Sequence, residues 1–238
     1  MNMNPTSPRR ILVTLACGLV VATAACGSDD SADALPPAAC DAYATIGAAM
    51  FGDPSGVPDA VVTLTSEAPE SLEEAATTYG AAFDAMMSGD ESALESDEFT
   101  AASEELGAAV YDSCESAAHL DVSGIDYGFE GLPESIDAGR VAIEFTNDTT
   151  MDEPHELVLM RKVDGVTETA AELLELPEDE LMSKIVPAAV VFADDKDGTG
   201  VALVDLEPGN YVAVCMIPTK GDSAPHAMNG MIADVVVA

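Results

Sequence analysis

Residues 207–238, EPGNYVAVCMIPTKGDSAPHAMNGMIADVVVA, combine two apolar, strand-like runs with several soft ligand atoms. The first run ends at Cys215, and His226 and Met231 follow before the second run. A thiol, an imidazole and a thioether therefore fall within 17 residues of a chain that has only 5 Cys and 3 His. These side chains suit a soft transition metal, but Cys215 would equally suit a buried strand followed by a loop. The rest of the sequence has to decide between the two interpretations.

Further strand patterns precede this stretch. Residues 139–148, GRVAIEFTND, alternate apolar and polar side chains, and residues 154–165, PHELVLMRKVDG, contain another apolar run. Residues 201–215 predict two short strands about a tight turn. Short strands separated by turns are typical of an antiparallel sandwich, whereas residues 166–183 have a helical pattern. We therefore predict an all-β sandwich with a helical insertion over residues 124–238.

Three motifs of this region follow one another at the predicted ends of strands. They are FTN at 145–147 with PHELVL at 154–159, then EPGNYVAVC at 207–215, then PHAMNGM at 225–231. In this order they resemble the plastocyanin-like cupredoxins, and the last motif is close to its form in copper nitrite reductases. The resemblance covers residues 124–238 and implies a Greek-key cupredoxin-like sandwich.

The resemblance also implies one type 1 copper ion and its ligands. His155, Cys215 and His226 match the three strong ligands, and Met231 matches the weak axial one, with Met228 as the alternative. A trigonal His₂Cys site with a long axial Met is the blue-copper arrangement. The chain would then be a one-electron carrier. Because the family commonly passes electrons through the last histidine, we expect an exposed edge on His226.

Two features depart from the family pattern. Ten residues separate Cys215 from His226, more than in most of the family, and Glu156 stands where an Asn usually braces the ligand loop. Two alternatives therefore stay open: a metal-free cupredoxin-like binding or structural module, and a protein that handles Cu(I) without electron transfer. The second would use further thioethers, which suit that soft ion. These are Met151, Met160, Met216 and Met228.

Residues 36–120 have a helical pattern instead. Two apolar stripes at helical spacing, with a first helix from Pro36 or Pro37, predict a small bundle of three or four helices. Ser71 and Glu74 have the spacing of a capping box ahead of the first stripe. The stripes are Leu72, Ala76, Tyr79, Phe83 and Met86, and Phe99, Leu106, Val110 and Cys114. The fold class is thus α+β in two parts, a helical bundle followed by the sandwich.

The first 35 residues predict export. Two arginines precede an apolar run at 11–21, which is too short for a spanning helix of about 20 residues. TAAC at 23–26 resembles the lipobox of bacterial lipoproteins, in which the cysteine is acylated. We predict a signal peptide at 1–25, a lipid on Cys26, an acidic tether at 26–35 and an extracytoplasmic, membrane-anchored protein. A plain secretory signal, an uncleaved anchor and twin-arginine export are alternatives.

The cysteines divide by position. Cys17 falls in the predicted signal peptide and Cys26 carries the predicted lipid. Cys40 and Cys114 lie near opposite ends of the helical part, each on an apolar face, so we predict that they form a disulfide outside the cytoplasm. Cys215 is then unpaired, and we expect it to be buried or to bind a metal.

The acidic charge argues against nucleic acid as a partner, and the absence of known catalytic motifs argues against several classes of enzyme. The chain has 44 acidic and 8 basic residues, a net charge of −36, so nucleic acid is not an expected partner. This acidity suits solubility in high salt, or steering toward a basic redox partner protein. HELVL at 155–159 lacks the second histidine of a zinc-protease motif, and no nucleophile elbow or P-loop is present. We therefore predict a binding protein or electron carrier and no enzyme.

Overall fold

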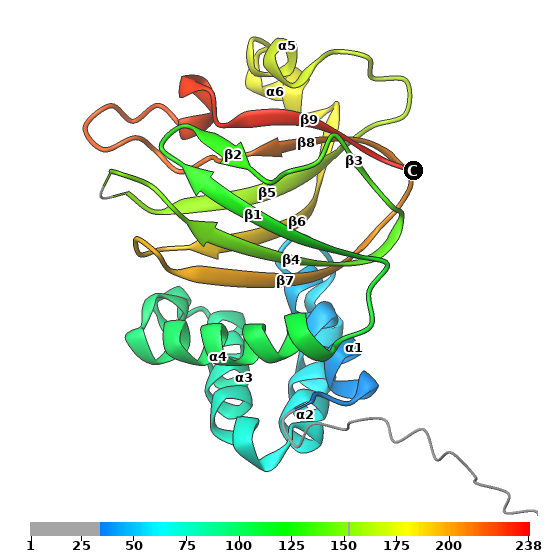
Figure 1. Ribbon diagram of the computed structural model, residues 1–238, viewed down its shortest axis with the longest axis vertical. Coiled ribbons are helices and arrows are strands. Elements are labelled where there is room, and N and C mark those ends of the chain that lie inside the picture. Colours follow the sequence, from blue (N-terminus) through cyan, green and yellow to red (C-terminus); the bar gives the residue numbers. More distant parts are fainter. Residues whose placement is uncertain (1–33, 152) are drawn as a thin grey trace, which may run out of the picture. The chain divides into compact units, whose positions relative to one another are not determined.

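The computed structural model describes residues 34–151 and 153–238 (Figure 1). The predicted signal peptide (1–25), Cys26 and most of the predicted tether (26–35) lie outside the described residues. Among the described helices, none is long and apolar enough to cross a membrane. A helical unit comes first and a β-sandwich with a helical insertion follows, so the predicted fold class is confirmed.

Four α-helices make up the N-terminal unit. They are α1 (Pro37–Ala48), α2 (Val57–Glu67), α3 (Glu73–Met87) and α4 (Asp97–Ser113), with short 3₁₀ turns η1 (Pro54–Gly56), η2 (Glu70–Leu72) and η3 (Glu91–Glu95) between them. Aromatic rings meet at the centre of the unit, because Tyr79 packs against Tyr43, Phe83 and Phe99 with ring centroids 5.3, 5.0 and 5.5 Å away. The predicted stripes therefore form the core that joins α1, α3 and α4.

The predicted capping box at Ser71 and Glu74 is wrong, because the chain makes a turn before the helix begins. The Leu72 N–H donates to the Pro69 carbonyl over 2.8 Å, which closes η2. Helix α3 starts one residue later and has no side-chain cap.

The disulfide expected within the helical part is present. Cys40 of α1 and Cys114, directly after α4, are bonded with their Cα atoms 5.7 Å apart. Cys215 is free and buried. The bridge ties the first helix of the unit to the end of the last one.

Nine strands in the described residues form two sheets, with the orders β2-β1-β4-β7 and β3-β9-β8-β5-β6. They are β1 (Ala118–Ile125), β2 (Gly128–Glu130), β3 (Ser135–Ile136), β4 (Gly139–Asn147), β5 (His155–Lys162), β6 (Ile185–Ala193), β7 (Thr199–Leu206), β8 (Gly209–Val214) and β9 (Ile232–Val237). The pairs β1–β4 and β3–β9 are parallel, so the sheets are mixed and not purely antiparallel as predicted. The short strands β2 and β3 carry the chain back, which lets β4 start beside the start of β1.

Four strands were not expected from the sequence, namely β1, β2, β3 and β6. β1 begins at Ala118, inside the range 36–120 that was predicted to be helical, and alternates exposed His119 and Asp121 with buried neighbours. β6 contains Pro187, which is unfavourable inside a sheet. It is tolerated because β6 is the edge strand and its register against β5 shifts at this point.

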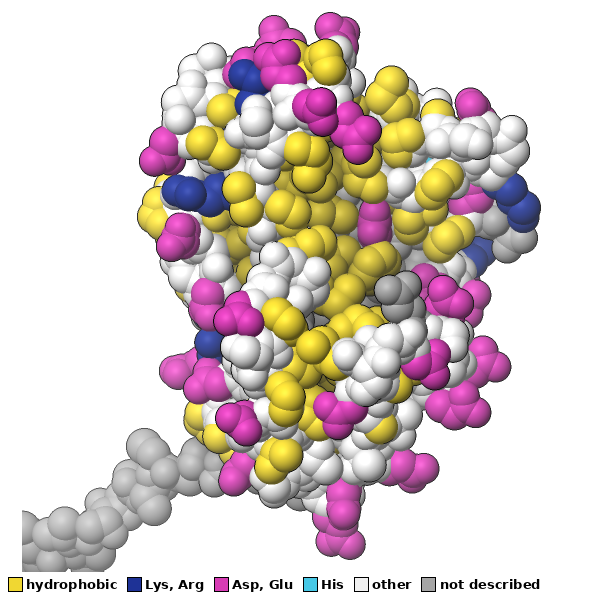
Figure 2. Space-filling view, turned by 180° about the vertical axis from the view of Figure 1, so that it is seen from behind, with side chains coloured by type: hydrophobic (Ala, Val, Ile, Leu, Met, Phe, Trp, Pro, Cys, Tyr) yellow, Lys and Arg dark blue, Asp and Glu magenta, His cyan; other side chains and the backbone are white. Residues whose placement is uncertain are grey.

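Helices cover the outer faces of both sheets. Ala142 of β4 and Leu203 of β7 belong to the same apolar cluster as the helical unit, and the Tyr43 hydroxyl donates to the Val201 carbonyl over 2.7 Å. On the second sheet, the insertion helices α5 (Ala170–Leu174) and α6 (Glu178–Met182) bury Leu173 in a separate cluster. Acidic side chains are spread around the face seen in Figure 2, and apolar ones gather in its middle.

Candidate metal centre

The three strong ligand candidates meet at one end of the second sheet. His155 is the first residue of β5, and Cys215 directly follows β8. β5 and β8 pair antiparallel, so the start of one strand lies beside the end of the other. His226 begins the 3₁₀ turn η4 (His226–Asn229), which leads into β9. Residues 71 positions apart in the chain are thus neighbours in the fold.

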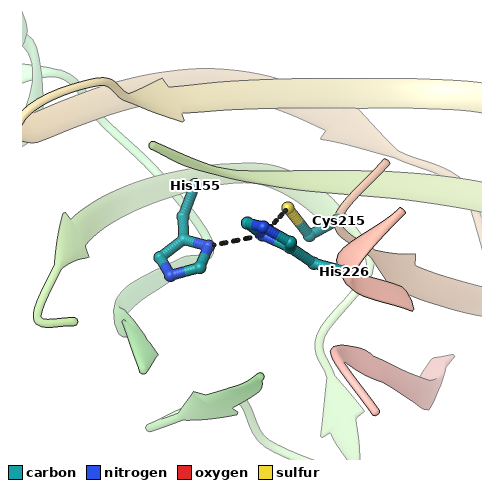
Figure 3. A group of neighbouring side chains, drawn as sticks. All are labelled: His155, Cys215 and His226. Carbon is teal, nitrogen blue, oxygen red and sulfur yellow. Dashed lines mark hydrogen bonds between the residues drawn. The ribbon is translucent and has the colours of Figure 1, made fainter. Parts of the chain in front are cut away.

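The side chains point their ligand atoms at one another (Figure 3). His155 Nδ1 lies 3.0 Å from His226 Nδ1, and Cys215 Sγ lies 3.5 Å from the same nitrogen. The ligand atoms of the three residues all lie within 4.8 Å of one another. All three side chains are 0% exposed. In the described part of the chain, no other group of His, Cys, Asp or Glu has this arrangement.

Met231 lies beside this group and Met228 does not. Met231 is 0% exposed and packs in the same apolar cluster as Cys215. Its N–H donates to the His226 carbonyl over 3.1 Å, and its carbonyl accepts from the Cys215 N–H over 3.2 Å. Met228 is 60% exposed, so the alternative axial position does not fit a ligand inside the sandwich. Of the two methionines, Met231 is therefore the one buried beside the three ligand candidates.

The long loop between Cys215 and His226 does not separate the two ligands. It folds back on itself, with a bridge between Pro218 and Pro225 and a bond from the His226 N–H to the Ile217 carbonyl over 2.9 Å. The excess residues form a small projection, and both ends of the loop stay at the site. The ten-residue spacing is therefore compatible with a common metal.

Glu156 braces the two ligand segments, as was expected of an Asn at this position. It is 7% exposed, and its Oε1 accepts from the Met216 N–H over 2.8 Å. Burial raises the pKa of Glu156, although the Met216 N–H partly opposes that shift. The bond joins the residue after His155 to the residue after Cys215, so it holds the two ligand segments together.

Burial favours the uncharged forms of His155 and Cys215. Burial, and then the neighbouring His226, lower the pKa of His155 to about 4. Burial also raises the pKa of the Cys215 thiol to about 11. At neutral pH His155 is therefore neutral and ready to bind through a lone pair, whereas Cys215 must release a proton when a metal binds.

The expectation of an exposed edge on His226 is wrong. The ring is 0% exposed because two groups cover it. Glu153 Oε2 lies 2.8 Å from its Nε2, and the ring of Tyr127 packs edge-on with centroids 5.5 Å apart. Glu153 was missed because acidic residues are so frequent in this chain that none could be singled out. Its only sequence signal is its place just before PH.

Solved structures of auracyanins and of rusticyanin are similar to about half of this chain. No family model and no curated protein matches the sequence. A reduced auracyanin from Roseiflexus castenholzii is 15% identical and aligns over 52% of this chain and 99% of its own, with a TM-score of 0.35. Auracyanin A, titled a "blue" copper protein from Chloroflexus aurantiacus, is 19% identical over 50% of this chain and 98% of its own, with a TM-score of 0.32. Rusticyanin from Thiobacillus ferrooxidans is 18% identical over 52% of this chain and 80% of its own, with a TM-score of 0.33.

The fold class follows from the strands and the site of the chain itself. Two sheets pack face to face, and the His–Cys–His group lies where β5, β8 and η4 meet. The C-terminal sandwich therefore has the two packed sheets and the convergent ligand residues that the resemblance to cupredoxins implies. Two imidazole Nδ1 atoms, one thiol and a buried thioether are the donor set of a blue-copper centre, so the cupredoxin-like site fits one type 1 copper ion.

Proposed function

We propose that this protein is a membrane-anchored, extracytoplasmic one-electron carrier with a single type 1 copper ion. The observation that carries the proposal is the convergence of His155 Nδ1, His226 Nδ1 and Cys215 Sγ in a fully buried site. Bound copper would supply a change between Cu(II) and Cu(I). The assignment of Met231 as the axial ligand is part of the proposal.

The chain itself fixes the positions of these ligand residues and shields them from solvent. His155 and Cys215 are fixed by neighbouring strands, and Glu156 ties their segments together. Full burial of the three side chains would keep water away from a bound ion. A site that changes little between two oxidation states needs little reorganisation for each electron, which suits a carrier.

Voltammetry of the purified, copper-loaded protein tests electron transfer. We expect one copper per chain and a reversible one-electron couple. The Cys215→Ser variant serves as the comparison, since it lacks the thiolate. Copper bound equally by parent and variant, with no reversible couple in either, would refute the proposed function.

A Cu(I)-delivery function is the second candidate, and exposed thioethers favour it. Met216 directly follows Cys215 and is 42% exposed, and Met228 lies two residues after His226 and is 60% exposed. Rapid loss of Cu(I) to a soluble chelator, slowed by replacing either methionine with Leu, would support delivery. A carrier should instead retain its copper in both oxidation states.

Attachment to a membrane is the remaining part of the proposal. The lipobox-like TAAC supports it, and the Cys40–Cys114 disulfide suits an oxidising compartment. The native protein should sediment with membranes, and Cys26→Ser should release it or block its maturation. If the Cys26→Ser variant sedimented with membranes as the parent does, lipidation would be excluded as the anchor.

A further inference from the structure

A carboxylate closes the far side of the His226 ring. Glu153 is two residues before His155, its side chain is 10% exposed, and its Oε2 lies 2.8 Å from His226 Nε2. The other nitrogen of the ring, Nδ1, faces His155 and Cys215. The imidazole is thus placed between a carboxylate on one side and the ligand group on the other.

This contact selects one tautomer of His226. An ionised carboxylate only accepts hydrogen bonds, so Nε2 must carry the proton that it donates to Glu153. In the neutral ring the lone pair is then on Nδ1, the atom that points into the ligand group. Carboxylate–histidine pairs of this kind orient a metal-binding ring and make it a stronger donor.

Glu153 is itself held from two directions. The buried side chain of Asn147, at the end of β4, donates from Nδ2 to the Glu153 carbonyl over 2.9 Å and to the Ala193 carbonyl over 3.2 Å. The Lys220 N–H, within the long ligand loop, donates to Glu153 Oε1 over 2.9 Å. The carboxylate therefore connects the segment before the first ligand to the loop that carries the last one.

We propose that Glu153 is a positioning residue for His226: it holds the ring with Nδ1 toward the ligand group, fixes the long loop, and seals the ring edge from solvent. This inference rests on the proposed copper site for its predicted effects on copper affinity and reduction potential. The effect of Glu153 on the ring does not, since the contact joins two side chains of the chain itself.

The first test uses the metal-free protein. Nitrogen-15 NMR of labelled histidine should show His226 as a single Nε2–H tautomer in the parent. Glu153→Ala should give a mixture of tautomers or the Nδ1–H form. Asp222→Asn removes a charge from an exposed position of the same loop and should behave like the parent. If Glu153→Ala fails to fold, Glu153→Leu, which restores apolar bulk without an acceptor, is measured instead.

The second test uses copper. Glu153→Ala, and Glu153→Gln as a variant of nearly equal size, should weaken Cu(II) binding by about 10- to 100-fold, the usual effect of losing such a partner. Both should raise the reduction potential relative to Asp222→Asn, because a weaker imidazole donor stabilises Cu(II) less. An unchanged tautomer in the metal-free variants, or unchanged affinity and potential, would overturn the role of Glu153. A parent that binds no copper would instead refute the proposed function, and the tautomer measurement would still decide whether Glu153 orients His226.

Discussion

Met231 and Met228 differ in burial although only two residues separate them. The first is 0% exposed beside Cys215, and the second is 60% exposed. Met231 is therefore the better candidate for the axial position of the proposed copper site. This difference in burial, and not the chemistry of the side chain, distinguishes the two candidates.

The two methionines therefore provide a matched pair of variants. Met231→Leu should retain copper and shift its potential upward, because losing a weak thioether favours Cu(I). Met228→Leu should leave the potential as it is in the parent. Voltammetry of both variants measures the difference, and a shift in Met228→Leu alone would move the axial role to that residue.

Gly124 in β1 leaves the space that His155 and Met231 occupy. A Cβ added there would lie 2.7 Å from Phe145 Cζ, 3.1 Å from Met231 Cε and 3.2 Å from His155 Cβ. Overpacking of this kind typically costs about 1–3 kcal/mol, so Gly124→Ala should lower the free energy of unfolding by that amount.

Urea unfolding followed by circular dichroism measures this effect. Gly47→Ala in α1 is the control, because a Cβ there meets no atom within 4 Å. It should be neutral or should stabilise by up to about 1 kcal/mol, since Ala favours a helix. Equal stability of the Gly124→Ala variant and the parent would contradict this prediction, because it would mean that the neighbouring side chains make room for the added Cβ.

Among the elements of the fold, those with simple periodicity were predictable. The stripes of α3 and α4, the alternation of β4 and the motifs around β5 and β8 all predicted their elements from local sequence. β6 was missed because its proline is acceptable only at a sheet edge, which is a tertiary property. The ligands could be named from motifs, whereas Glu153 required the fold, since its partner is 73 residues away.

Tyr43 joins α1 to β7 and should make stability depend on alkaline pH. Burial raises the pKa of Tyr43 from 10.0 to about 12. Because the folded pKa lies above the unfolded value, this contribution to stability is complete below pH 10 and is lost as the pH rises toward 12. The free energy of unfolding of the metal-free protein should therefore fall across this range.

Tyr43→Phe isolates that contribution. It should reduce the decrease between pH 10 and 12, with Tyr79, whose pKa burial also raises, supplying part of what remains. At pH 7 the variant should be less stable by about 1 kcal/mol, because the Val201 carbonyl loses its hydrogen bond. Urea unfolding at several pH values measures both effects, and an unchanged dependence on pH would contradict them.

In the whole molecule, the disulfide closes the helical unit, and a shared apolar core joins that unit to the sandwich. Cys40 and Cys114 are 74 residues apart, so their bond constrains a long segment of the unfolded chain. In the chain-entropy description such a loop contributes about 4 kcal/mol. The Cys40→Ala, Cys114→Ala double variant should lose up to that amount of stability.

Urea unfolding of the double variant and non-reducing peptide mapping of the parent test this pairing. The map should show Cys40 linked to Cys114 and Cys215 free. The copper site should survive in the double variant, since its ligands all lie in the sandwich. A disulfide containing Cys215 would contradict both the pairing and the metal centre.

Titration of the purified metal-free protein with Cu(II), followed by visible absorption and electron paramagnetic resonance, is the most direct test of the copper assignment. The structure predicts an intense thiolate-to-copper charge-transfer band that saturates at one copper per chain and disappears in Cys215→Ser. His155→Ala and His226→Ala should each weaken copper binding. No such band in the parent, with equal copper affinity in all three variants, would contradict the assignment of His155, Cys215 and His226 to one copper ion.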